Sequence, residues 1–324
     1  MVSSRIKNSI FASLLVILTT NCQPESVTQT TSEVPPTTDR SQTIVLADIS
    51  DEPAKTIERY QPLANYLANE LNNIEVGQVE VAPDMNTMAE WLKSGKVDVY
   101  FDSPYPSMIV SDLSGAQPIL RRWKNGVDAY HAIIFTHSDG VKTLDDLKGQ
   151  MIAFEENFST SGYMLPLAYF TESGIKLVEQ PSVRTSISSD RVGYVFSKGA
   201  ENSIQWVLNQ RVAAAAVGAP DFQEIPADIR QQLTILGETE TLPRHLVMVS
   251  PTLSPEEIEA IKAVLLAMDE TELGQKVLAS FEQTTKFDEF PEGLDRALNR
   301  MRQLYQLTKE QEIQPLEKIG NEKN

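Results

Sequence analysis

The chain has a single cysteine, few histidines and a shortage of positive charge. Cys22 has no partner in the sequence, so an internal disulfide is excluded. The histidines are His131, His137 and His245, too few and too scattered for a histidine-rich metal site. Lys and Arg number 28 against 45 Asp and Glu, which gives a formal net charge of −17. This charge argues against nucleic acid and broad anionic membrane surfaces, but a pocket's local dipoles can still favour a small anion.

The motifs of common enzyme classes are absent as well. The sequence contains no Walker loop, dinucleotide fingerprint, His-Glu-x-x-His motif or internal repeat. It also lacks a nucleophile elbow and a recognisable pair of catalytic carboxylates. With 324 residues, of which 41% are hydrophobic, the chain is long enough for two lobes with separate cores. We therefore expect no cofactor, no metal and no enzymatic activity, with an exported hydrolase as the remaining enzymatic alternative.

The N-terminal segment contains a short apolar run that is typical of an export signal. Arg5 and Lys7 precede the run Ile10–Leu18, which has the length of a signal core and is too short to span a membrane. Cys22 follows at the place of a bacterial lipobox cysteine, although Asn21 stands where lipoboxes usually carry a small residue. The segment therefore predicts lipidation at Cys22.

The N-terminal segment also predicts the cellular location of the protein. We expect residues 1–22 to be a lipoprotein signal peptide and residues 23–42, rich in Thr, Ser and Pro, to be a flexible tether. The protein would then lie on the periplasmic side of the bacterial inner membrane, or on the extracellular face of the cell membrane, attached only through its lipid. A plain cleaved signal and an uncleaved anchor are the alternatives.

From residue 43 onward, apolar runs alternate with amphipathic segments. This alternation predicts βαβ units and an α/β fold with a mainly parallel sheet. Strands are expected at Thr43–Ala47, Val76–Ala82, Val97–Phe101, Gln117–Arg122, Ala129–Thr136, Gln150–Phe154, Gly193–Phe196, Arg211–Val217 and Pro243–Val249. Helices are expected at Lys55–Leu71 (regular from Pro62), Met85–Lys93, Ser107–Leu113, Thr143–Leu147, Tyr163–Ser173, Ala200–Asn209, from the Ser254 cap onward, Glu272–Phe281 and Pro291–Leu307.

One strand-to-helix turn has the composition of an anion site. The strand ending at Phe154 is followed by Ser159, Thr160 and Ser161, which open the next helix. A helix N-terminus has unpaired N–H groups and about half a positive charge, so it can hold an oxyanion without Lys or Arg. The same hydroxyls are also ordinary helix caps. Taken alone, the turn fits either role.

Other polar residues follow predicted strands in the same way. The carboxyl ends of strands are where open α/β sheets bind ligands, so these residues are candidates for the same site. They are Ser50, Asp51, Glu52, Asp102, Ser103, Tyr105, Tyr130, Asp221 and His245. Each of them alone is also explained as a turn residue, a cap or an aromatic on a sheet face.

Several motifs together resemble a known family. They are Tyr60–Leu67, Gly95–Val99, Tyr130 ahead of an apolar strand, Asp145–Gly149, and Ala153-Phe154 followed by Ser159–Tyr163. From about residue 43 to 307 the chain is similar to the periplasmic substrate-binding proteins of phosphonate, phosphite and phosphate ABC transporters, the phosphonate-binding-protein family. The resemblance implies a type II periplasmic-binding-protein clamshell. Lobe 1 would comprise residues 43–132 and 241–320, and lobe 2 residues 133–240, each a mainly parallel sheet flanked by helices.

The resemblance also implies a ligand site. The turn Ser159–Ser161 would hold the oxyanion with hydroxyls and N–H groups, Tyr130 aligns with a ligand tyrosine, and Asp221 falls where the family has a carboxylate. A carboxylate that faces an oxyanion is favourable only if the anion keeps a proton to donate or the ligand has an amine. Tyr105 is expected beside these residues.

This sequence departs from the family pattern at three ligand positions. Met85 replaces a second ligand tyrosine, Glu201 stands where the family has His, and His245 stands where it has Asp. The expected function is the substrate-binding component of an ABC importer that captures a phosphorus oxyanion by lobe closure, as a monomer that docks on a permease and binds no nucleic acid. The alternatives are a sensor lipoprotein of the same fold that signals to a membrane receptor, or a binding protein for a different small anion.

Overall fold

The computed structural model describes residues 42–313. The predicted signal peptide with Cys22, the predicted tether apart from its last residue, and residues 314–320 of predicted lobe 1 lie outside the described residues. Within the described range, no helix has the length and apolar character needed to cross a membrane.

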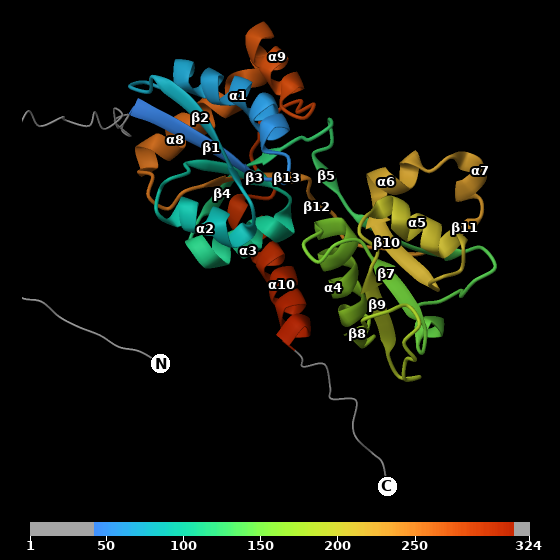
Figure 1. Cartoon of the computed structure of the whole chain (residues 1–324). Coiled ribbons are helices and arrows are strands. Elements are labelled where there is room, and N and C mark those ends of the chain that lie inside the picture. Colours follow the sequence, from blue (N-terminus) through green and yellow to red (C-terminus); the bar gives the residue numbers. More distant parts are fainter. Residues whose placement is uncertain (1–41, 314–324) are drawn as a thin grey trace, which may run out of the picture. The chain divides into compact units, whose positions relative to one another are not determined.

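The first sheet has six strands in the order β14-β4-β13-β3-β1-β2 (Figure 1). Strand β1 pairs in parallel with β2 and β3, whereas β13 runs antiparallel to β3 and β4, and β14 antiparallel to β4. The bounds are β1 Thr43–Ile49, β2 Val76–Ala82, β3 Val99–Asp102, β4 Gln117–Arg122, β13 His245–Val249 and β14 Phe287–Asp288.

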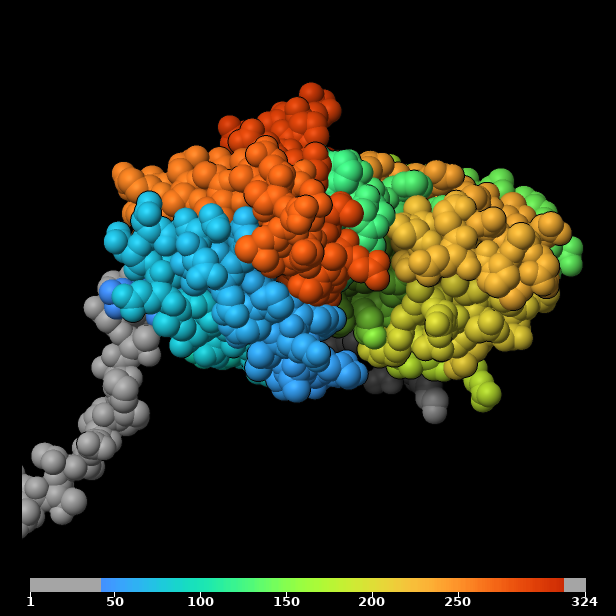
Figure 2. All heavy atoms as spheres, turned by 90° about the horizontal axis from the view of Figure 1, so that it is seen from above, coloured from blue at the N-terminus to red at the C-terminus, as the bar shows by residue number. Residues whose placement is uncertain are grey.

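Helices cover both faces of this sheet. They are α1 Pro53–Glu70, α8 Pro255–Ala267 with the 3-10 turn η4 Met268–Glu270, and α9 Glu272–Ser280 on one face, and α2 Met85–Lys93, α3 Pro104–Ser114 and α10 Leu294–Ile313 on the other. Figure 2 shows α1, in blue, lying beside the orange segment of α8 and α9. Beneath these helices, a core cluster that includes Leu46, Leu63 and Phe281 is fully buried.

The second sheet also has six strands, in the order β11-β6-β10-β7-β9-β8. Strands β10, β7, β9 and β8 are parallel neighbours, and β6 runs antiparallel to β10 and β11. The bounds are β6 Ala132–His137, β7 Met151–Phe154, β8 Leu177–Glu179, β9 Val192–Phe196, β10 Ala214–Gly218 and β11 Leu233–Glu238.

Shorter elements complete the second sheet and its connections. The helices are η2 Asp145–Leu147, η3 Thr160–Met164, α4 Leu165–Glu172, α5 Ala200–Leu208, α6 Ala219–Glu224 and α7 Ala227–Arg230. Two chain segments run between the sheets and pair as the strands β5 Ala129–Tyr130 and β12 Leu242–Pro243. Helix α10 contacts both α3 and α4, and Arg300 on α10 pairs with Glu172 and Glu240.

The alternation of strands and helices that the sequence predicts is confirmed. Helix α2 has the predicted bounds, and Ser254 caps α8 in a reciprocal capping box with Glu257. The prediction that the first helix becomes regular only at Pro62 is wrong, because α1 runs unbroken from Pro53. Proline removes one helical hydrogen bond, and burial of Tyr60 and Leu63 on either side of it against the sheet offsets that loss.

Several elements do not appear among the predictions, and some predicted strands are too long; the expected strand Pro243–Val249, for example, is divided between β12 and β13. The expected strand Ala129–Thr136 is two strands, β5 and β6, because the chain passes from one sheet to the other there. The edge strand β11 and the short helices α6 and α7 carry no clear periodic pattern. The bounds of these elements depend on how they pair with or pack against neighbouring elements, and a local sequence pattern does not contain this information.

Candidate functional site

A cavity of about 760 Å³ is lined by the ends of strands from both sheets, and we call it the edge cavity. The carboxyl ends of β1, β3, β7 and β10 and the amino end of the antiparallel strand β13 lead into it, which is the expected place for a ligand in α/β proteins. The predicted site residues that line it are Met85, Tyr130, Ser159, Thr160, Ser161, Asp221 and His245.

Two predicted site residues lie elsewhere. Glu201 is exposed in the first turn of α5 and does not line the edge cavity, in contrast to the prediction. Tyr105 is 1% exposed and does not line it either, because its ring packs between Tyr163 and Tyr305. Its backbone nevertheless takes part in the structure of the site.

Ser159 is the cap residue of the helix that follows β7. Its Oγ accepts the Gly162 N–H at 2.9 Å and donates to Glu155 Oε2 at 3.1 Å. The cap role that the sequence left open is therefore present. The helix begins with the π-helical turn η3, in which Thr160 and Ser161 are both buried.

Thr160 links the edges of the two sheets. Its Oγ1 accepts the backbone N–H of Tyr105 at 2.9 Å and donates to Ser103 Oγ at 3.1 Å, although both partners belong to the turn and helix after β3. Tyr130, whose pKa is raised by burial, lines the same cavity. One threonine hydroxyl thus satisfies an N-terminal amide of α3 and holds the floor of the edge cavity together.

Ser161 and Asp221 meet at the end of β10. A Cβ atom at Gly218 would lie 2.7 Å from Asp221 Oδ2 and 3.1 Å from Ser161 Oγ. The absence of a side chain at this position lets the serine hydroxyl and the carboxylate approach the same strand end. Burial raises the pKa of Asp221 although Arg244 acts in the opposite direction.

Glu155 is the first residue after β7, and its carboxyl group lies on the serine-rich turn. A Cβ atom at Gly162 would be 2.3 Å from Glu155 Cδ. The other oxygen, Oε1, is buried and has no hydrogen-bond partner in the part of the chain that the structure describes. Burial and the nearby Asp221 raise the pKa of Glu155 to about 7.

Two cations line the edge cavity, and sequence reasoning missed both. The Arg244 guanidinium lies 4.6 Å from the centre of the Tyr130 ring, and Lys124 Nζ pairs with Glu282 Oε2 at 3.1 Å. Lys124 follows β4 and Arg244 directly precedes β13. Their positions beside strand ends are the signal that could have found them.

Glu282 joins the cavity to a buried charge network. It pairs with Arg122, Lys124 and Arg59, and the Arg122 side chain is completely buried. Burial alone would raise the pKa of Glu282, but Arg122 and Lys124 outweigh burial and lower the pKa to about 2. Arg122 also stacks on Phe281 and donates to Thr284, which fixes the loop after α9.

His245 lines the edge cavity, and its imidazole is neutral. Burial lowers the pKa of its imidazole, and Lys124, Arg122 and Arg244 lower it further. Its Nδ1 is buried and has no hydrogen-bond partner among the described residues. A neutral imidazole can accept or donate a hydrogen bond, whereas an aspartate can only accept while ionised.

Carboxylates outnumber cations around the edge cavity. They are Asp48, Asp51, Asp84, Asp102, Glu155, Glu156, Asp221 and Glu282. Burial, together with Asp102, raises the pKa of Asp48 to about 7, and burial also raises that of Asp102. Part of the negative charge around the cavity is therefore neutralised by protons near neutral pH.

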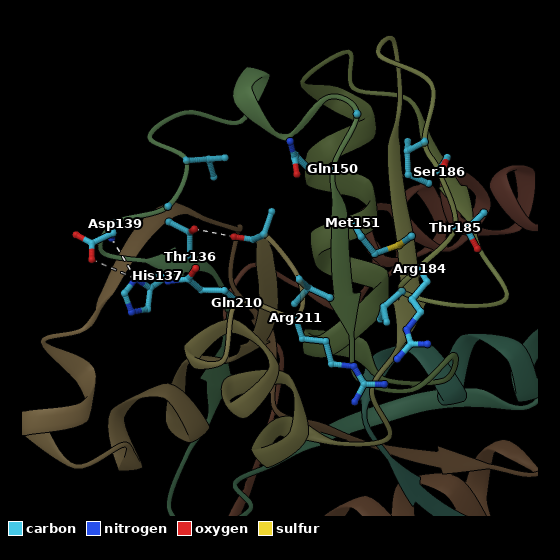
Figure 3. Close-up of a pocket in the computed structure, with 17 residues that line it drawn as sticks. Thr136, His137, Asp139, Gln150, Met151, Arg184, Thr185, Ser186, Gln210 and Arg211 are labelled. Atoms are coloured by element: carbon cyan, nitrogen blue, oxygen red, sulfur yellow. Dashed lines mark hydrogen bonds and ion pairs between the residues drawn. The ribbon is translucent and has the colours of Figure 1, made fainter.

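A second cavity, of about 480 Å³, lies at the opposite end of the second sheet, where β7 and β10 begin (Figure 3). In Figure 3, His137 and Asp139 lie together at one side, and Arg184 and Arg211 lie apart from them. None of the predicted ligand residues lines this cavity. Among the described residues, no cluster of His, Cys, Asp and Glu is arranged to hold a metal ion.

The fold and the edge cavity define an α/β ligand-binding protein, and its structural neighbours are periplasmic binding proteins. One neighbour is XAC2383 from Xanthomonas citri, solved with chloride, with 25% identity and a TM-score of 0.74 over 84% of this chain and 99% of that chain. Another is PhnD1 from Prochlorococcus marinus in complex with methylphosphonate, with 13% identity and a TM-score of 0.55 over 82% of this chain and 98% of that chain.

Sequence comparison identifies the family. The chain belongs to the family "ABC transporter, phosphonate, periplasmic substrate-binding protein", whose profile matches residues 48–292. The phosphate-import protein PhnD of Mycolicibacterium smegmatis is 23% identical in an alignment of length 236 that covers 69% of this chain and 71% of that protein. The protein is therefore the substrate-binding protein of a phosphonate-type ABC transporter, in a family of non-enzymatic binding proteins.

Proposed function

We propose that this protein captures a phosphorus oxyanion (phosphonate, phosphite or phosphate) in the edge cavity and presents it to an ABC permease. The observation that carries the proposal is the convergence of the Ser159–Ser161 turn, Tyr130, Lys124 and Arg244 on that single cavity. Hydroxyls, amides and two cations are the donors that recognise a tetrahedral oxyanion. The relative from M. smegmatis is named for phosphate import, and XAC2383 was solved with an anion.

Capture is proposed to occur by closure of two lobes, residues 43–132 with 241–320 and residues 133–240. The proposal is supported by the division of the described residues into two sheets, joined by the paired crossover strands β5 and β12. Ligand groups held from both sheets would stabilise the closed arrangement, as in other hinge-closing binding proteins. No bond is made or broken.

The protein is further proposed to act as a monomer at the membrane, attached through a lipid on Cys22. Replacement Cys22→Ser should release it from the membrane fraction into the periplasmic or culture fraction without changing ligand affinity. Retention of the variant in the membrane fraction would contradict the lipid anchor.

The ligand class is tested by calorimetry and thermal shift with phosphate, phosphite, methylphosphonate, sulfate and taurine. A ligand that binds only the folded state stabilises it by mass action, by about 2.7 kcal/mol at a hundredfold excess over Kd, and so raises the melting temperature. We expect shifts with the phosphorus compounds, and loss of binding in the double variant Ser161→Ala, Arg244→Ala. Shifts with sulfate and taurine alone would refute the ligand class.

A further inference from the structure

The second cavity, at the opposite end of the second sheet from the edge cavity, has no part in the proposed function. It has a volume of about 480 Å³ and lies where β7 and β10 begin, beside the loop of residues 181–190 (Figure 3). Pockets that bind small organic molecules have volumes of about 300–1,000 Å³. The size of the second cavity therefore fits an organic molecule, and a bare inorganic ion would leave most of it empty.

Two arginines line the second cavity without carboxylate partners. Arg184 belongs to the loop of residues 181–190, and Arg211 to the turn before β10. In the part of the chain that the structure describes, neither of them forms an ion pair, whereas Arg191 pairs with Asp190 at 3.7 Å. Because carboxylates far outnumber cations in this chain, two unpaired guanidinium groups at one cavity are donors available to an anion from outside.

Both arginines are positioned by contacts that do not use their guanidinium N–H groups. Arg211 stacks on the Trp206 ring, with 4.2 Å between the guanidinium carbon and the ring centre. The loop that carries Arg184 is fixed by Ser182, whose Oγ accepts the Arg184 backbone N–H at 3.2 Å, and by Ile187, which packs against the core. Donors that are positioned before binding reduce the entropy that a ligand must lose.

Gln210 also lines the second cavity, and its backbone has a conformation that favours glycine. It follows the end of α5 at φ 52°, a position where helices usually have Gly or Asn because a larger side chain is strained there. Strain of this kind is typical of residues whose side chain serves a function. The Gln210 amide supplies further N–H donors next to Arg211 in the sequence.

The other side of the second cavity has the opposite polarity. His137 and Asp139 lie together there, away from Arg184 and Arg211 (Figure 3). A carboxylate at this side repels a second anionic group and attracts an ammonium group. The cavity thus separates a positive side from a negative side.

We propose that the second cavity is a binding site for a small organic zwitterion, whose carboxylate or phosphate group lies on Arg184 and Arg211 and whose ammonium group points towards Asp139. Gln210 donates its amide to the anionic group. The two cavities share no lining residue, so this site is separate from the edge cavity and its ligand is independent of the phosphorus oxyanion proposed there.

The three tryptophans of the chain allow the two cavities to be observed separately. Trp206 stacks with Arg211 of the second cavity, Trp123 precedes Lys124 of the edge cavity, and Trp91 on α2 lines neither. The indole N–H signals are recorded by NMR in full-length protein with isotopically labelled tryptophan, and each is assigned from a Trp→Phe variant. The protein is titrated with γ-aminobutyrate, which has a carboxylate head, with phosphoethanolamine, which has a phosphate head, and with sulfate as a bare anion.

The variants separate the cations from the amide. Arg184→Gln combined with Arg211→Gln removes both guanidinium groups, and Gln210→Gly removes the amide while it relieves the backbone strain. Arg230→Gln is the matched control, because Arg230 is an arginine of the same half of the chain, on α7, that lines neither cavity.

We expect at least one zwitterion to shift the Trp206 signal to saturation and to leave the Trp91 signal unchanged. The midpoint should rise at least tenfold in the double arginine variant and at least threefold in Gln210→Gly, and should keep the wild-type value in Arg230→Gln. The preferred head group, carboxylate or phosphate, is the one with the lower midpoint.

Three results would overturn the proposal. The first is a Trp206 signal that neither zwitterion moves in the wild type, including the case in which only Trp123 responds. The second is a double arginine variant that binds as tightly as the wild type. The third is a sulfate titration with the same shift and midpoint as the zwitterions, which would show a general anion contact in place of a site for an organic molecule.

Discussion

Replacement of Glu282 by Gln should destabilise the protein strongly at neutral pH. Glu282 is the common anionic partner of Arg122, which is completely buried, and of Lys124, which is 22% exposed. The fall of its pKa from 4.5 to about 2 corresponds to about 3 kcal/mol, at about 1.4 kcal/mol for each pH unit. Removal of one partner of a buried pair costs a similar amount, about 3–5 kcal/mol, because the other charge stays buried.

The lowered pKa of Glu282 also predicts the direction in which its contribution to stability changes with pH. Because the pKa of Glu282 is lower in the folded than in the unfolded chain, its contribution is complete above about pH 4.5 and is lost as the pH falls towards 2. The free energy of unfolding, measured by urea denaturation, should differ between wild type and Glu282→Gln by about 3 kcal/mol at pH 7, and the difference should shrink below pH 4.5.

The control is Glu259→Gln, which breaks the ion pair with Lys262 on α8. Glu259 is 70% exposed, so its loss should cost less than about 1 kcal/mol. The reasoning about Glu282 is refuted if its variant is no less stable than this control at pH 7, or if the difference from wild type is constant from pH 6 to pH 3.

Other substitutions test the packing around the site. Thr160→Val keeps the shape but removes the acceptor of the buried Tyr105 N–H, so stability should fall by about 1–3 kcal/mol in thermal or urea unfolding, whereas Thr160→Ser should stay close to wild type. Gly77→Ala places a Cβ atom 2.1 Å from the Ala64 carbonyl oxygen, and the resulting shift of α1 from β2 should cost about 1–3 kcal/mol by the same measurement. Ser254→Ala removes the α8 cap and should cost about 1 kcal/mol, with Ser254→Asp as the rescuing variant. Wild-type stability in any of these variants would contradict the contact on which it rests.

The sequence was sufficient for those parts of the fold that local chemistry determines. A helix such as α2 combines an apolar stripe with an Asp84 cap and a glycine just past its end, so its bounds are encoded within about a dozen residues. The proline in α1 misled the same reasoning, because the favourable burial that maintains this helix comes from the first sheet. Local signals define an element only where packing does not override them.

The candidate site was predictable to a similar extent. The position of Ser159–Ser161 follows from a strand-to-helix turn, and the structure places this turn in the edge cavity with Tyr130 and His245. The function of the Thr160 hydroxyl could not be predicted, because its partners are about 55 residues away in sequence. Lys124 likewise depends on Glu282, which lies in a loop at φ 49° and follows no pattern.

Two kinds of group surround the edge cavity: hydrogen-bond donors placed by the fold, and ionisable side chains that are particular to this chain. The donors at η3 and the hydroxyl of Tyr130 arise from strand ends, and they would attract any small oxyanion. Glu155 adds a carboxyl group beside these donors, and the neutral His245 offers either a donor or an acceptor where an aspartate could only accept. Since the net charge of −17 repels all anions alike, it cannot distinguish among them. Discrimination between similar anions must therefore come from groups within hydrogen-bond reach. Among the described residues that line the edge cavity, Glu155 and His245 each have a buried polar atom without a hydrogen-bond partner.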